Sequence, residues 1–170
     1  MEFSVIQGDI ASKRADALVN AAGTSLRMGS GVAGALRAEG GEELHEAAIE
    51  EGPIELGEVA VTDAFALDAE YVIHAAAMPH DGDGTATARS IRSATRNALE
   101  TADELGCQSL VLPALGCGVA GFDLERGASL ICDEIARFDP QSLSDVRVIG
   151  YSDEEFVTIT EAASQGPRSP

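Results

Sequence analysis

Short apolar runs alternate along this chain with stretches in which apolar residues recur at helical spacing. We predict β-strands at the short runs, which span residues 3–7, 17–19, 59–62, 71–74, 110–112 and 146–149. We predict α-helices at the stretches with helical spacing, which span residues 35–38, 42–51, 85–105, 124–138 and 153–163. Strands that alternate with helices are typical of an α/β sandwich around a largely parallel sheet. One domain is expected over residues 1–164, followed by a frayed tail at 165–170.

Two glycine-rich loops each lie between a predicted strand and a predicted helix. The first spans residues 28–34, and the second spans residues 114–121 and leads to Asp123, a candidate N-cap of the next helix. A helix N-terminus attracts anions because its first N–H groups are unpaired and its dipole end is positive. Ligands of parallel sheets bind beyond the carboxyl ends of the strands. We therefore expect both loops to face one crevice and to hold phosphate, although a plain strand-to-helix turn explains the second loop equally well by itself.

The second loop resembles two nucleotide-binding motifs without completing either. Three of its glycines have the G-x-G-x-x-G spacing, but the acidic residue that a dinucleotide fold needs about 20 positions later falls at Glu134, inside a predicted helix. Phe122 and Asp123 stand where a P-loop requires Lys and Ser or Thr. The loop therefore disfavours both a redox dinucleotide and a nucleoside triphosphate.

The net charge narrows the partners that this chain can have. Its 170 residues include 29 Asp plus Glu against 11 Lys plus Arg, which gives a formal charge of −18. Such an excess repels nucleic acid and anionic membranes, and salt is needed to screen its self-repulsion. We therefore predict an acidic, halophilic protein of the cytoplasm with no membrane partner. An ordinary acidic protein is the alternative.

The apolar content and the cysteines exclude further classes of protein. No apolar run is long enough to span a membrane, and the N-terminus lacks the basic and apolar regions of a signal peptide. Cys107, Cys117 and Cys132 have the spacing of neither a zinc site nor a disulfide framework, so no metal is expected.

Three features invite a chemical interpretation that we weigh against a structural one. Cys117 in the second glycine loop is a candidate nucleophile, but a small residue that permits close backbone approach is favoured. His74 at the end of a strand is a candidate general base, but a packed histidine is favoured. The His and Asp residues at 80–83 resemble a metal site less than a solvated turn.

Five segments in one order resemble the macro domain family, whose members bind ADP-ribose and its derivatives. They are residues 8–10 (GDI), 16–22 (DALVNAA), 29–36 (GSGVAGAL), 71–74 (YVIH) and 112–119 (LPALGCGV). The resemblance covers nearly the whole chain. It implies a three-layer α/β/α sandwich with a mixed, largely parallel central sheet, no cofactor and a monomer.

The resemblance assigns ligand contacts to residues of this chain. Asp9 would accept a hydrogen bond from the adenine amino group, beside the N–H of Ile10. Tyr151 would pack on the adenine, and Asn20 would orient the distal ribose as the candidate catalytic residue. Backbone donors would hold the diphosphate from two sides, from Gly29, Ser30, Gly31, Val32 and Ala33 on one side and from Leu115, Gly116, Cys117, Gly118, Val119 and Ala120 on the other.

The chain departs from the family pattern at three positions that concern catalysis. Gly23 stands where hydrolytic relatives have the second asparagine of N-A-A-N, and Ala33 stands where some hydrolases have an aspartate. Ala120 replaces an aromatic residue that many members place beside the distal ribose.

Three functions therefore stay open. The first is binding of ADP-ribose with substrate-assisted hydrolysis of ADP-ribosyl linkages on protein or nucleic acid, in which the substrate's own phosphate activates the water. The second is hydrolysis of free ADP-ribose 1''-phosphate or O-acetyl-ADP-ribose, and the third is a non-catalytic reader. Contact with nucleic acid is expected only through an ADP-ribosyl group.

Overall fold

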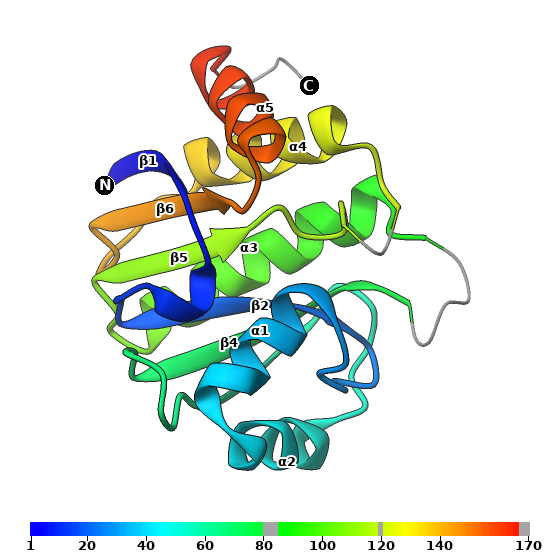
Figure 1. Ribbon diagram of the computed structural model, residues 1–170. Helices are drawn as coiled ribbons and strands as arrows, with labels where there is room; N and C mark the ends of the chain where they lie inside the picture. The colour runs from blue at the N-terminus through cyan, green and yellow to red at the C-terminus, as the bar shows by residue number, and fades with distance from the viewer. Residues whose placement is uncertain (80–84, 119–120, 167–170) are drawn as a thin grey trace.

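A six-stranded sheet lies between two layers of helices (Figure 1). The computed structural model describes residues 1–79, 85–118 and 121–166. The strands are β1 (Glu2–Gln7), β2 (Ala17–Gly23), β3 (Val59–Asp63), β4 (Tyr71–Met78), β5 (Ser109–Pro113) and β6 (Asp145–Gly150). The helices are the short 3-10 helix η1 (Ile10–Ser12) and α1 (Gly31–Gly40), α2 (Glu42–Glu51), α3 (Ala88–Glu104), α4 (Leu124–Arg137) and α5 (Asp153–Ser164).

The sheet has the strand order β1-β6-β5-β2-β4-β3. Every neighbouring pair is parallel except β3 and β4, which are antiparallel at one edge. The mixed, largely parallel sandwich expected from the sequence is therefore confirmed. Among the described residues, no helix is long and apolar enough to cross a membrane.

Each face of the sheet has its own hydrophobic core. Helices α1 and α2 cover one face, and α3, α4 and α5 cover the other (Figure 1). The predicted inward stripe of α3 is confirmed, since Ile91, Ala94 and Ala98 are fully buried. Burial of such a stripe drives helix packing because apolar area leaves water.

Three element boundaries differ from the sequence prediction by four residues, more than the others do. Strands β2 and β4 continue past their predicted ends to Gly23 and Met78. Their alanine-rich ends looked like loops because Ala is depleted in strands. The two strands pair with each other there, with Ala21 opposite Ala75. Helix α1 begins at Gly31, so part of the first glycine-rich segment is the first turn of a helix.

A chain of buried polar side chains links β2, β4 and β3. Asn20 Nδ2 lies 3.0 Å from His74 Nδ1, and His74 Nε2 lies 3.0 Å from Thr62 Oγ1. An amide nitrogen can only donate, so Nδ1 accepts, and this geometry assigns the ring proton to Nε2, which donates to Thr62. Burial lowers the pKa of His74 to about 4. The favoured interpretation of His74 as a packed histidine agrees with this placement.

We expect His74 to make the protein less stable in mild acid. Its pKa is about 4 in the folded protein against an ordinary value of 6.5 in the unfolded chain, so the unfolded state alone binds the proton between these pH values. The free energy of unfolding is not lowered by this effect above about pH 6.5. It falls by about 3 kcal/mol as the pH drops towards 4. Denaturant unfolding at several pH values measures this loss.

The matched variants are His74→Gln and, as the control, His45→Gln on the partly exposed face of α2. The His74→Gln protein should start less stable and lose less of its remaining free energy of unfolding over this pH range. Equal losses in the wild type and in His74→Gln would contradict the prediction.

Candidate ligand-binding crevice

A crevice of about 440 Å³ opens at the carboxyl ends of the parallel strands. Its wall begins at the ends of β1 and β6, crosses β5 and β2, and reaches Met78 at the end of β4. The first turn of α1 and the second glycine loop face each other across it. The residues that line it are Gly8, Asp9, Ile10, Ala21, Ala22, Ser30, Gly31, Val32, Ala35, Met78, Pro113, Ala114, Gly116, Cys117, Gly118, Leu124, Ile149, Tyr151 and Glu155.

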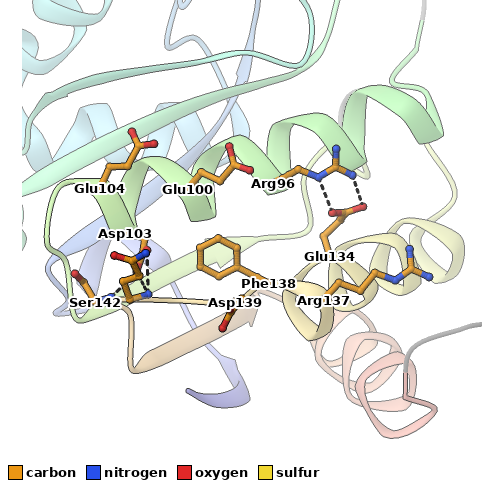
Figure 2. Close-up of a pocket in the computed structure, with 10 residues that line it drawn as sticks. Arg96, Glu100, Asp103, Glu104, Glu134, Arg137, Phe138, Asp139 and Ser142 are labelled. Atoms are coloured by element: carbon orange, nitrogen blue, oxygen red, sulfur yellow. Dashed lines mark hydrogen bonds and ion pairs between the residues drawn. The ribbon is translucent and has the colours of Figure 1, made fainter.

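Two larger depressions exist, but several of their polar side chains form hydrogen bonds or ion pairs that hold the fold together. The first, of about 720 Å³, lies between the C-terminal parts of α3 and α4 (Figure 2). There Arg96 forms two 3.1 Å hydrogen bonds with Glu134, and the Asp103 carboxylate accepts backbone N–H groups of residues 141–143. These hydrogen bonds explain why the pKa of Asp103 lies below its usual value. These polar contacts therefore stabilise the packing of α3 against α4 and residues 141–143.

The second depression, of about 590 Å³, lies at the opposite end of the strands. Its Asp16 carboxylate accepts the N–H groups of Gln108 and Ser109, and Arg147 pairs with Asp145 at 2.9 Å. Parallel sheets bind ligands at the carboxyl end of their strands, so the smaller crevice is the stronger candidate.

Most of the sequence-predicted ligand contacts meet in the crevice. Asp9, Ile10, Ser30, Gly31, Val32, Gly116, Cys117, Gly118 and Tyr151 line it. Gly29, Leu115 and Ala33 adjoin it without lining it, and Leu115 and Ala33 are buried. Val119, Ala120 and the turn at 80–83 lie outside the described residues, as do residues 167–170 of the predicted tail.

Asn20 does not point where the resemblance implied. Its side chain is 1% exposed, bonds to His74 in the interior and is absent from the crevice wall. Its Oδ1 is the buried side-chain oxygen that lacks a hydrogen-bond partner among the described residues. In this geometry, the Asn20 side chain does not reach a ribose in the crevice.

Helix α1 presents open donors to the crevice. Its N-cap, Ser30, makes no side-chain capping hydrogen bond, and no acidic residue occupies its first turn. The first intrahelical bond of this turn runs from Gly34 N to Ser30 O, at 3.1 Å. The N–H groups of Gly31, Val32 and Ala33 precede that bond and have no partner within the helix. Together with the helix dipole, they make this end a site for an anion.

The start of α4 confirms the predicted N-cap and is a weaker candidate for anion binding than the sequence suggests. Asp123 is its N-cap, as expected, but the carboxylate itself accepts the N–H of Arg126 at 2.9 Å. A negatively charged cap already occupies the place that a phosphate would take. The second loop can still offer its loop amides, although Cys117 N donates to Ala114 O. The first loop is therefore the stronger candidate for an anion site.

The glycines of the second loop fall into two physical classes. Gly116 has a φ of +77°, and a Cβ there would lie 2.7 Å from the Cβ of Ala86, so the fold itself requires glycine. Gly118 lacks a positive φ, and a Cβ there would meet no atom of the described residues within 4 Å. Gly29 of the first loop is like Gly118 in both respects. The missing side chains at 29 and 118 keep the backbone accessible to a ligand.

The Cys117 thiol and the Asp9 carboxylate of the crevice differ in what they can do chemically. Burial, then the charges of Asp123 and Glu155, raise the pKa of the Cys117 thiol to about 12. The thiol is therefore protonated near neutral pH, which argues against a nucleophile. Asp9 caps η1 through Oδ1, which accepts the N–H of Ala11 at 2.9 Å. Its other oxygen makes no hydrogen bond within the described part of the chain and can accept one from a ligand.

Glu155 is a crevice residue that sequence reasoning missed. It lies in the first turn of α5 and accepts the backbone N–H of Tyr151 at 2.8 Å. The sequence gives one indication that Glu155 could line a crevice, which is its place just after the last strand. This indication is weak, because many helices have acidic residues in their first turn only to stabilise the helix N-terminus.

Known proteins were compared with this chain. A sequence profile of the macro domain family matches residues 19–131. An uncharacterized protein of Mycobacterium tuberculosis is 44% identical over 98% of this chain, which spans 46% of that relative. An uncharacterized protein of Sulfolobus acidocaldarius is 38% identical, with 92% of this chain and 87% of the relative covered. The chain thus spans about half the length of the mycobacterial relatives it matches.

Solved macrodomains have the same fold. A variant of the Oceanobacillus iheyensis macrodomain with ADPR superimposes with a TM-score of 0.86 at 26% identity, over 95% of this chain and 91% of the other. The Trypanosoma brucei macrodomain in complex with ADP-ribose has a TM-score of 0.84 at 23% identity, over 94% of this chain and 68% of the other. The family profile, which matches residues 19–131, agrees with this likeness. This chain belongs to the macro domain family.

Proposed function

We propose that this chain binds ADP-ribose, free or attached to another molecule, in the crevice at the carboxyl ends of its strands. The observation that carries the proposal is the uncapped N-terminus of α1, which faces an open glycine loop across 440 Å³ of crevice. The macrodomains of similar fold that were solved with ADP-ribose support the choice of ligand.

The strand order suggests how the ligand would lie. Asp9, Tyr151 and Ile149 come from the β1 and β6 side, which would receive the adenine. The diphosphate would sit between the first turn of α1 and Gly118 in the middle. The distal ribose would then extend over the end of β2 towards Met78 on β4.

Hydrolysis of an ADP-ribosyl linkage is the second candidate function. The described residues that line the β2 and β4 end are Ala21, Ala22 and Met78, none of which can take a proton from water. The carboxylates of Asp9 and Glu155 belong to the opposite end. Such a distribution favours a mechanism in which the substrate's own phosphate activates the water. Asn20 would support β2 beneath the ribose and would not contact it.

Gly118→Val is expected to weaken ADP-ribose binding without changing the stability of the fold. Wild-type protein should bind ADP-ribose in calorimetric titration at molar salt, and the variant should bind at least about tenfold more weakly because the side chain covers the loop amides. Its free energy of unfolding should stay within about 0.5 kcal/mol of wild type, because a Cβ there meets no atom within 4 Å in the described part of the chain.

Gly116→Ala serves as the contrasting variant. It should lower the free energy of unfolding by about 1–3 kcal/mol, since Gly116 has a positive φ and lies against Ala86. No heat with ADP-ribose in the wild type would overturn the proposed function. Undiminished affinity in Gly118→Val would overturn the placement of the diphosphate.

Asp9→Ser tests the adenine contact while keeping the local fold. Serine can still accept the N–H of Ala11, so the cap of η1 survives while the carboxylate is lost. We expect a loss of about tenfold in affinity for ADP-ribose, the size of one charge-assisted hydrogen bond. The matched ligand carries hypoxanthine, which lacks the amino group, and its affinity should change much less. Equal losses for both ligands would contradict the contact.

Activity is tested on ADP-ribosylated protein, ADP-ribosylated DNA and ADP-ribose 1''-phosphate. If ADP-ribose is released from either polymer, substrate assistance predicts that Asp9→Ser alters KM and leaves kcat within about twofold. A fall in kcat of more than about tenfold would show that a protein carboxylate takes part. Turnover of the 1''-phosphate alone would favour the free metabolite, and no turnover would favour a reader.

A further inference from the structure

The crevice wall is acidic although its proposed ligand is an anion. Among the described residues that line it, two carry a negative charge, Asp9 and Glu155, and none is lysine or arginine. The whole chain adds a formal charge of −18. A phosphate site built on Lys or Arg gains from Coulomb attraction, whereas this one works against repulsion and relies on neutral amides.

Glu155 is held in this position by the chain around it. Its own N–H donates to Ser152 Oγ at 3.1 Å, and its carboxylate accepts Tyr151 N at 2.8 Å. Gly150 lets the start of α5 press against the end of β6, since a Cβ there would lie 2.6 Å from Phe156 N. The side chain is half-buried, so its charge is screened less than that of a surface residue.

The charge of Glu155 reaches the second glycine loop. After burial and the charge of Asp123, Glu155 is the third cause that raises the pKa of Cys117 in that loop. Cys117 precedes Gly118, where the diphosphate is proposed to lie. Glu155 and Gly118 line the same crevice, so a ligand phosphate at Gly118 would lie in the negative field of this carboxylate.

We propose, resting on the function proposed above, that Glu155 limits the affinity for ADP-ribose and makes its binding tighten as ionic strength rises. Screening shortens the reach of a charge from about 10 Å at 0.1 M salt to about 3 Å at 1 M. The amide hydrogen bonds to the diphosphate are short contacts and survive this screening. Salt therefore weakens the repulsion between Glu155 and the phosphates but leaves the amide hydrogen bonds in place. A phosphate site built on Lys or Arg behaves in the opposite way, because salt weakens its binding.

The first arm of the experiment titrates the wild-type protein with ADP-ribose and with adenosine. Potassium chloride is varied from about 0.1 M to about 2 M. The Kd for ADP-ribose is expected to fall by about fivefold or more over this range, while that for uncharged adenosine changes much less. Adenosine reports any effect of salt on apolar contacts, which is shared by both ligands. Affinity for ADP-ribose that weakens with salt would overturn the inference while leaving the proposed function intact.

The second arm compares Glu155→Gln with Glu154→Gln. Glutamine keeps an acceptor for Tyr151 N–H, and Glu154 lies in the same turn of α5 without lining the crevice. Glu155→Gln should bind ADP-ribose about three- to tenfold more tightly than wild type at 0.1 M salt and equally at 2 M. Glu154→Gln should follow wild type, and equal behaviour of both variants would overturn the role of Glu155.

Only salt concentrations at which all three proteins have the same far-UV circular dichroism are compared, so unfolding cannot mimic a change in affinity. Absence of ADP-ribose binding at every salt concentration would overturn the proposed function, and this inference with it.

Discussion

The parallel pairing of β1, β6, β5, β2 and β4 is the constraint on which the candidate site depends. Parallel strands end at the same edge, so segments from residue 8 to residue 155 meet in one crevice. The pairing also requires helical crossovers, and these cover both faces of the sheet with apolar side chains. The antiparallel strand β3 lies at one edge and contributes no residue to the crevice wall.

Helices α3, α4 and α5 each close their N-terminus with a side chain of their own, whereas α1 does not. Thr87, Asp123 and Ser152 accept N–H groups in the first turns of α3, α4 and α5. A satisfied N-terminus offers few donors to a ligand, and a carboxylate cap opposes an anion further. The uncapped N-terminus of α1 is therefore the better candidate to bind an anion. The composition of the two glycine loops does not reveal this difference, because both are similarly rich in glycine.

The sequence was sufficient for the features that depend on local spacing. The bounds of α2, the buried stripe of α3 and the N-cap at Asp123 follow from periodicity and capping chemistry. The direction of Asn20 does not, because it depends on the register that sets this residue opposite His74 in another strand. The place of Glu155 in the crevice wall does not follow from the sequence either, since an acidic residue in a first helical turn has the same local pattern whether or not a crevice lies beside it.

The proposed use of amides for an anion is consistent with the engagement of many arginines of this protein elsewhere. Several described arginines form ion pairs that tie elements together or stiffen one element. The pairs are Arg37 with Glu42, Arg92 with Asp133 and Glu134, Arg96 with Glu134, and Arg147 with Asp145. With 29 acidic side chains for 11 cations, a cation placed in the crevice would be partly neutralised by neighbouring carboxylates. Backbone N–H groups carry no net charge for neighbouring carboxylates to neutralise, and the first N–H groups of α1 have no side-chain cap, so they would be able to hold a diphosphate on a surface whose overall charge repels it.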